Sequence, residues 1–184
     1  MKLILINIIY KMITQFKIFE NKEVKPDVNS VSPEFWEMVK IADWKSFIDD
    51  SSDVTLLPYM TRLDAIKTRV YLKYELSQIK EFLDEYHILY MQLYDYFYTT
   101  WLNDQYSDYM PSDDGYGDLL SSIIGLGKDY VKKITKAKFI KMAKDDYYAE
   151  NFCYILNVEN NENEYWEIKI KADPFWGAVR KYNL

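Results

Sequence analysis

Apolar side chains recur at intervals of three and four residues through much of this chain, which is the spacing of one face of an α-helix. The clearest stripe, over residues 77–103, consists of Ile79, Phe82, Tyr86, Tyr90, Leu93, Phe97 and Trp101. A second, over residues 56–76, consists of Leu56, Met60, Leu63, Ile66, Val70 and Tyr74. Each stripe predicts a long helix with one face in a core.

Residues that favour helix ends predict further helices on both sides of this pair. Ser32 followed by Pro33 is a helix start, because serine caps free N–H groups and proline fits the first helical position. Thr135 predicts another start, for a short helix that carries Phe139, Ile140 and Ala143. Between them, residues 116–134 read as one helix with Gly127 on its apolar stripe, where we expect it to allow close helix approach.

The period changes near the C-terminal end. Phe152, Tyr154, Leu156 and Val158 alternate with other residues, as do Trp166, Ile168 and Ile170 in a second run. A polar segment separates the runs, which predicts a β-hairpin. The expected fold is therefore mainly α, a single-domain helical bundle with a small C-terminal β-hairpin. We divide it into an extension and linker (1–31), a helical domain (32–145), and a hairpin and tail packed on that domain (146–184).

The N-terminal eleven residues are apolar but too few to span a bilayer, which needs about 20. No small-residue cleavage site follows them. Either translation starts at Met12, or this run packs on the domain as a strand or short helix. One cysteine, Cys153, excludes an internal disulfide and fits a reducing compartment. We therefore expect a cytoplasmic protein without membrane association.

Charge is distributed unevenly along the chain. No lysine or arginine occurs between Glu81 and Gly127, whereas residues 128–144 hold seven lysines. Antiparallel helices could neutralise one another, or the surface could be polarised toward a charged partner. The net charge of −6 opposes nucleic-acid binding. An acidic surface that imitates a nucleic-acid backbone, and so occupies a protein that handles nucleic acid, is a further alternative.

The turn at residues 112–115 holds the clearest candidate polar site: Asp113, Asp114 and, one turn on, Asp118. Adjacent carboxylates can hold a divalent cation or act as an acid–base pair in a hydrolytic or metal-dependent enzyme. The simpler interpretation is that Ser112 or an aspartate caps the following helix and Gly115 relieves the turn. The EF-hand pattern is not met, because Met110 and Ser121 stand where that loop needs carboxylates.

Other catalytic groupings are not indicated. His87 is the one histidine and lies far along the chain from Cys153, so nothing predicts a nucleophile with its base. Gly125 and Gly127 lack the strand and the Gly-Lys-Ser/Thr of a phosphate loop. We expect no catalytic residue, no cofactor and no metal.

Four tyrosines recur every fourth residue between Tyr86 and Tyr98, which forms a slanting ridge on the longest predicted helix. Tyrosine buries area while keeping a polar tip, and is enriched where proteins bind one another. The end of this ridge meets an acidic loop, so the candidate interaction surface is Tyr94, Tyr98, Asp104 and Asp108. We expect the partner to be another protein; the oligomeric state is left open.

Two separated pieces carry a resemblance to a known family. They are the PEFWEMV segment at residues 33–39, and the SDDGY segment at 112–116 with Leu119, Ile124 and the GKDY at 127–130. Both are similar to a bacterial domain family of unknown function, numbered four-two-four-zero, and LSQIKEF at 76–82 is similar to its central helix. The resemblance covers about residues 34–144; here residues 105–111 replace small residues of the family. It implies a compact helical domain and no activity.

Together these observations favour a non-enzymatic protein-interaction or accessory protein of bacterial or phage origin.

Overall fold

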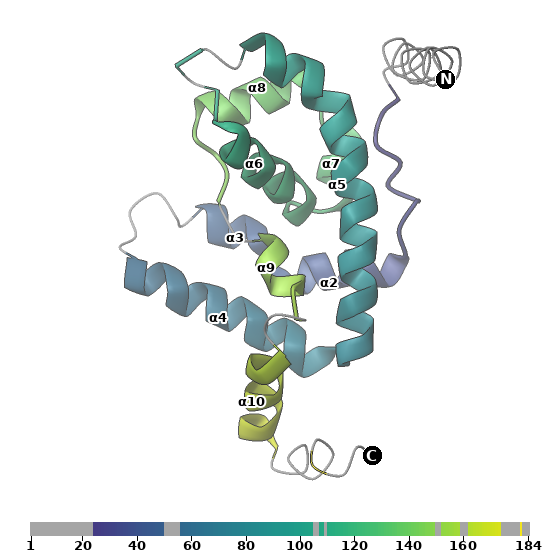
Figure 1. Ribbon diagram of the computed structural model, residues 1–184, viewed down its shortest axis with the longest axis vertical. Helices are drawn as coiled ribbons and strands as arrows, with labels where there is room; N and C mark the ends of the chain where they lie inside the picture. The colour runs from purple at the N-terminus through teal and green to yellow at the C-terminus, as the bar shows by residue number, and fades with distance from the viewer. Residues whose placement is uncertain are drawn as a thin grey trace, which may run out of the picture.

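The computed structural model describes residues 24–49, 56–104, 107–108, 110–149, 152–158, 162–173 and 181, without the side chains of residues 56–60 and 104. These residues are mainly α-helical, and no β-strand occurs among them. The helices (Figure 1) are α2 (Pro33–Ala42), α3 (Trp44–Asp49), α4 (Leu56–Lys73), α5 (Leu76–Asp104), α6 (Asp113–Gly125), α7 (Lys128–Lys133), α8 (Lys136–Lys144), α9 (Phe152–Leu156) and α10 (Glu162–Ala172). The N-terminal apolar run, Met12 and residues 174–180 of the predicted tail lie outside the described residues.

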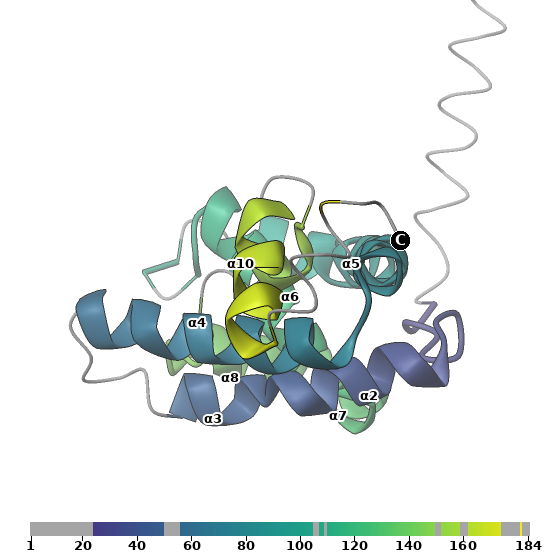
Figure 2. The ribbon, with the colours of Figure 1, turned by 90° about the horizontal axis from the view of Figure 1, so that it is seen from below.

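The helices gather around α5, which runs along one side of the molecule (Figure 1). Helices α6, α8 and α9 pack on α5, while α4 packs on α2 and α10. Figure 2 shows α2 and α3 following α4 on its far side from α10. In the described part of the chain, no helix combines the length and the hydropathy that crossing a membrane requires.

Trp44 joins α3 to α6 at the centre of the core, where its side chain is fully buried. A Cβ atom on Gly125 of α6 would lie 2.6 Å from Cδ1 of Trp44, so the ring packs directly on the α6 backbone. The Trp44 indole Nε1–H donates to Oγ of Ser122 at 3.5 Å. Ser122 Oγ in turn donates to the Ala149 carbonyl and accepts from the Ala149 N–H, both at 3.0 Å. Trp44 and Ser122 together thus connect α3, α6 and the segment that precedes α9.

The two predicted helix starts are confirmed. Ser32 accepts the Phe35 N–H at 3.0 Å ahead of α2, which has Pro33 as its first residue. Thr135 accepts the Lys138 N–H at 3.3 Å ahead of α8.

The prediction of one helix over residues 116–134 is wrong, because the chain breaks between α6 and α7. Gly127 adopts φ +96°, a left-handed conformation that glycine tolerates and other residues rarely adopt. Its N–H donates to the Ile124 carbonyl at 2.9 Å, which closes the end of α6. Nothing lies within 4 Å of a Cβ built on Gly127. The close approach that we expected there occurs instead at Gly125.

The predicted C-terminal β-hairpin is also wrong: its two runs form α9 and α10. In α9, Phe152, Ile155 and Leu156 are buried whereas Tyr154 is exposed, so burial follows a helical period and not alternation. In α10 the buried residues are Tyr165 and Lys169, one turn apart. Acidic residues in the first turn of α10 and lysines in its last turn suit the helix dipole.

Helix α10 is held on α4 and on the turn that follows α4 by two ion pairs and a buried tyrosine. Lys67 Nζ lies 2.9 Å from Oε2 of Glu164, and the buried Lys169 Nζ lies 3.5 Å from Oε1 of Glu75. Tyr165 is fully buried and donates its hydroxyl to the Tyr74 carbonyl at 3.3 Å. These contacts stabilise a helix at residues 162–172. They require Tyr165 and Lys169 to lie one helical turn apart, whereas the two residues would lie farther apart in a strand.

Because Trp44 packs on Gly125, the change in the free energy of unfolding caused by Gly125→Ala tests this contact. Helix propensity alone would raise the free energy of unfolding by about 1 kcal/mol. A methyl group against the indole ring should instead lower it by about 1–3 kcal/mol, as urea unfolding can measure. Gly127→Ala is the comparison. It should lower the free energy of unfolding by about 1–2 kcal/mol through backbone strain alone, because no atom lies near the added methyl group. A Gly125→Ala variant more stable than the natural chain would contradict this packing.

Candidate functional site

Asp113 and Asp114 lie in the first turn of α6, and both side chains are exposed. Ser112 is the N-cap, and its side chain accepts the Gly115 N–H at 3.4 Å. Carboxylates in this position stabilise a helix through its dipole without any ligand. No group of three or more His, Cys, Asp or Glu residues in the described ranges could hold a metal ion. The geometry of this turn is that of a helix cap.

Asp118 has a different environment from the two aspartates that precede it. Its charge acts on Cys153 of α9 and on Tyr86 and Tyr90 of α5. Tyr86 is buried and shares a hydrogen bond of 2.5 Å with Ser121. The structure therefore separates the predicted trio: Asp118 faces a polar cluster between α5, α6 and α9, and Asp113 and Asp114 face solvent.

The polar cluster that Asp118 faces contains Cys153, Tyr86 and Tyr90, and the pKa of each of these three groups is raised. Burial, and then the nearby Asp118 charge, raises the pKa of the Cys153 thiol. Burial likewise raises the pKa of the Tyr86 and Tyr90 hydroxyls. Because the thiolate is the reactive form of cysteine, these shifts oppose a nucleophilic role. His87 is exposed, with its ring 5.6 Å from that of Tyr86.

The four tyrosines of the ridge on α5 lie ring beside ring, from the core at Tyr86 to the surface at Tyr98, and we call this row of rings the tyrosine ladder. Centroid distances are 5.8 Å from Tyr86 to Tyr90, 6.4 Å from Tyr90 to Tyr94 and 5.3 Å from Tyr94 to Tyr98. Tyr94 is half-buried and also packs on Tyr116 of α6, whose hydroxyl donates to the Tyr94 carbonyl at 2.9 Å. Tyr94 therefore holds α6 against α5, and Tyr98 is the member that reaches solvent.

Tyr98 belongs to a row of exposed residues along α5, which we call the outer face: Asp84, Ile88, Met91, Asp95, Tyr98 and Leu102. The spacings alternate between four and three, so the side chains share one side of the helix. The exposed fractions are 45% for Ile88, 54% for Met91, 39% for Tyr98 and 40% for Leu102. Apolar side chains exposed in a continuous row mark a binding surface more often than scattered ones do.

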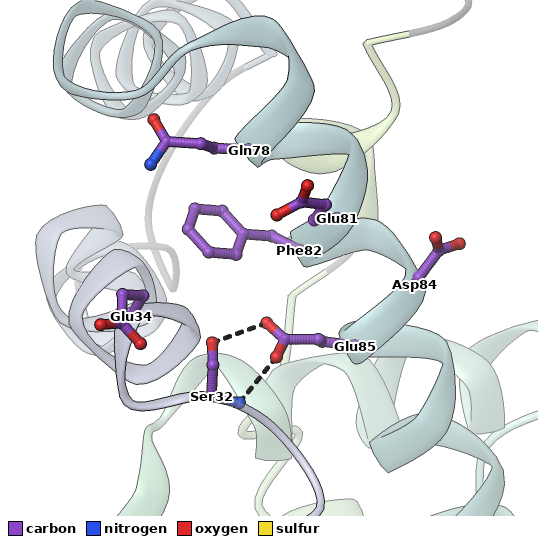
Figure 3. Close-up of a pocket in the computed structure, with 7 residues that line it drawn as sticks. All are labelled: Ser32, Glu34, Gln78, Glu81, Phe82, Asp84 and Glu85. Atoms are coloured by element: carbon purple, nitrogen blue, oxygen red, sulfur yellow. Dashed lines mark hydrogen bonds between the residues drawn. The ribbon is translucent and has the colours of Figure 1, made fainter.

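An acidic hollow adjoins the N-terminal end of the outer face, between α5 and the start of α2 (Figure 3). Its volume is about 420 Å³, and its lining residues are Ser32, Glu34, Gln78, Glu81, Phe82, Asp84 and Glu85. Figure 3 shows Glu34, Glu81 and Glu85 around the Phe82 ring, with Asp84 pointing away. The Glu85 carboxylate accepts the Ser32 N–H at 2.6 Å and the Ser32 hydroxyl at 3.0 Å, so it holds α2 on α5.

The four predicted interaction residues do not lie on one surface in the structure. Tyr98 is on the outer face, Tyr94 is in the ladder, Asp108 is exposed in the loop after α5, and the side chain of Asp104 lies outside the described residues. Sequence reasoning missed Ile88, Met91 and Leu102. Ile88 and Met91 are three residues apart and Leu102 is four residues after Tyr98, but the more apolar stripe on the opposite side of α5 obscured this spacing.

The lysines after Gly127 lie on α7 and α8. Lys128, Lys132 and Lys133 are exposed, and the α8 pair Lys141–Asp145 joins residues one turn apart. That these lysines neutralise the acids of α5 remains a prediction.

Comparisons of the chain with protein-family models, with curated proteins and with solved structures find no match. The resemblance over residues 34–144 therefore remains a prediction.

The different environments of Asp118 and Asp114 predict different effects on Cys153. Asp118→Asn removes a negative charge near the thiol, so the pKa of Cys153 should fall and its alkylation by iodoacetamide at pH 8 should accelerate. Asp114→Asn, on the same helix but facing solvent, is the matched control and should leave the rate unchanged. Equal rates in both variants, measured by mass spectrometry, would show that Asp118 does not act on the thiol.

Proposed function

We propose that this chain is a non-enzymatic protein that binds another protein, and that the outer face of α5 receives a cationic, apolar segment of that partner. The observation that carries the proposal is the row of Ile88, Met91, Tyr98 and Leu102, exposed at helical spacing. Burying such side chains supplies the affinity of helix-in-groove and helix-on-helix contacts.

The acids of the outer face favour a cationic partner. Asp84 and Asp95 are exposed within the row, Glu81 is exposed three residues before Asp84, and Asp108 is exposed in the loop after α5. Between Glu81 and Gly127 the sequence offers no lysine or arginine to offset them. Opposite charge across an interface speeds association and selects against acidic competitors.

The alternatives have less support. A hydrolytic or metal site at Asp113 and Asp114 would need converging polar groups, whereas both side chains face solvent beside a serine cap. An imitation of a nucleic-acid backbone would need a run of acids, whereas apolar residues separate Asp84 from Asp95 on the outer face. We retain bacterial or phage origin as part of the proposal, from the family resemblance, and a cytoplasmic location, from the lone cysteine.

An amphipathic peptide of leucine and lysine is a suitable probe, with the same peptide carrying glutamate for lysine as its control. The natural chain should bind the lysine peptide in isothermal titration calorimetry and should not bind the glutamate peptide. Met91→Glu or Asp95→Lys should each weaken binding about tenfold, which is about 1.4 kcal/mol. The former makes the patch less apolar, and the latter reverses a charge.

Leu72→Glu is the matched control variant, because Leu72 is also an exposed apolar residue but lies on α4. It should bind the lysine peptide as the natural chain does. Unchanged binding in the Met91 and Asp95 variants, or equal binding of the two peptides, would contradict the proposed surface.

A further inference from the structure

The outer face of α5 has the dimensions of a short peptide segment. From Ile88 to Leu102 it extends fourteen residues along the helix, or about 21 Å at 1.5 Å per residue. Its exposed apolar side chains are interspersed with the exposed carboxylates Asp84 and Asp95, and Lys80 lies one helical turn before Asp84. The ligand chemistry that fits is therefore an apolar stretch with positive charges and no acids.

The chain itself contains a segment with this chemistry. Residues 1–19 read MKLILINIIYKMITQFKIF, which is mostly apolar, with lysines at positions 2, 11 and 17 and no acidic residue before Glu20. The segment is complementary to the outer face in both apolar character and charge. At about 3.3 Å per residue when extended, or 1.5 Å when helical, nineteen residues are long enough to cover 21 Å.

The described stretch that follows this segment in the chain lies along α5. The Asp27 N–H donates to Oε1 of Gln92 at 2.6 Å, and Nε2 of Gln92 donates to Oγ of Ser30 at 3.0 Å. Ser32 is held seven residues lower on α5, by Glu85. The chain preceding α2 therefore follows α5, and lower residue numbers lie toward the C-terminal end of that helix, as Figure 1 shows.

Gln92 is a close neighbour of the outer face, being adjacent to Met91 and three residues from Asp95. Val24, where the described chain begins, is 68% exposed. The four residues 20–23 are thus all that separate the apolar segment from Val24, at the start of the stretch that Gln92 and Glu85 hold on α5. Such a short tether gives a high effective concentration, in the millimolar range.

We propose that residues 1–19 pack on the outer face of α5 and compete there with the partner's cationic segment. The competition rests on the proposed function, because it requires that a partner binds the outer face. The contact of residues 1–19 with α5 does not depend on the proposed function. The segment acts as a built-in ligand that a partner of higher affinity displaces.

Photo-crosslinking in the full chain tests the contact. Tyr10 is replaced by p-benzoylphenylalanine, which inserts readily into methionine side chains, and Met91 is on the outer face. Irradiation should join residue 10 to the α5 peptide containing Met91 within one chain, as mass spectrometry and a monomer band on a gel would show. Met91→Asp with Leu102→Asp should abolish this product, whereas Leu72→Asp should not.

Three outcomes would overturn the contact. One is a crosslink to another part of the chain, and another is a product confined to dimers, which would assign the segment to a second copy. The third is no crosslink together with sedimentation of the chain on phosphatidylglycerol vesicles, which would assign the segment to a membrane surface.

The lysine peptide then tests the competition. Ile6→Asp with Ile9→Asp, again in the full chain, should disable the segment and raise the affinity for the peptide about tenfold or more, given the millimolar effective concentration of the tether. Ser51→Asp with Ser52→Asp is a control for added charge elsewhere and should leave the affinity unchanged.

The failures are distinguishable. No gain in affinity, with peptide binding still sensitive to Met91→Glu, would reject the competition and leave the proposed function standing. A crosslink to Met91, with no peptide binding even in the Ile6 and Ile9 variant, would reject the proposed function and leave the intramolecular contact standing.

Discussion

The burial of one side of α5 is the constraint on which the rest of the structure depends. Ile79, Leu89, Leu93 and Phe97 are fully buried along this helix, and α6, α8 and α9 pack around it. At 3.6 residues per turn, fixing those residues inward fixes which residues point outward. The outer face is therefore a geometric consequence of the core, and its apolar composition is what calls for a functional explanation.

The tyrosine ladder connects the two sides of α5. Residues four apart advance about 40° around a helix, so the ridge starts at the buried Tyr86 and ends at the exposed Tyr98. Inside, it holds α6 through Tyr94 and Tyr116. Outside, it adds an aromatic side chain to the outer face. The same periodic sequence thus contributes to folding at one end and to a candidate binding surface at the other.

The elements that could be predicted from sequence are those set by local signals. Ser32 and Thr135 start helices because capping depends on neighbouring residues alone. The helix break at Gly127 could not be predicted, because it depends on the backbone conformation of that residue. An apolar stripe gives no information about backbone conformation. The second run of the expected hairpin was read by alternation, but pairing of Lys67 with Glu164 and of Glu75 with Lys169 favours a helix on α4. Such long-range contacts are absent from a local pattern.

The candidate site was only partly predictable for the same reason. Tyr98 followed from its spacing, whereas Ile88, Met91 and Leu102 could be recognised only after the opposite stripe was known to be buried. Asp118 was grouped with Asp113 and Asp114 by proximity in sequence, yet α9 brings Cys153 to Asp118 alone among them.

The central claim is that one side of α5 stabilises the fold and the opposite side binds a partner. Its most direct test is a substitution scan along α5 in which each variant is measured both for free energy of unfolding and for binding of the lysine peptide. We expect that alanine at Ile79, Leu89 or Leu93 lowers the free energy of unfolding by about 2–5 kcal/mol. Alanine at Ile88, Met91 or Leu102 should cost less than about 0.5 kcal/mol and weaken binding. Outer-face variants that lose stability as the inner ones do, with binding unchanged, would contradict it.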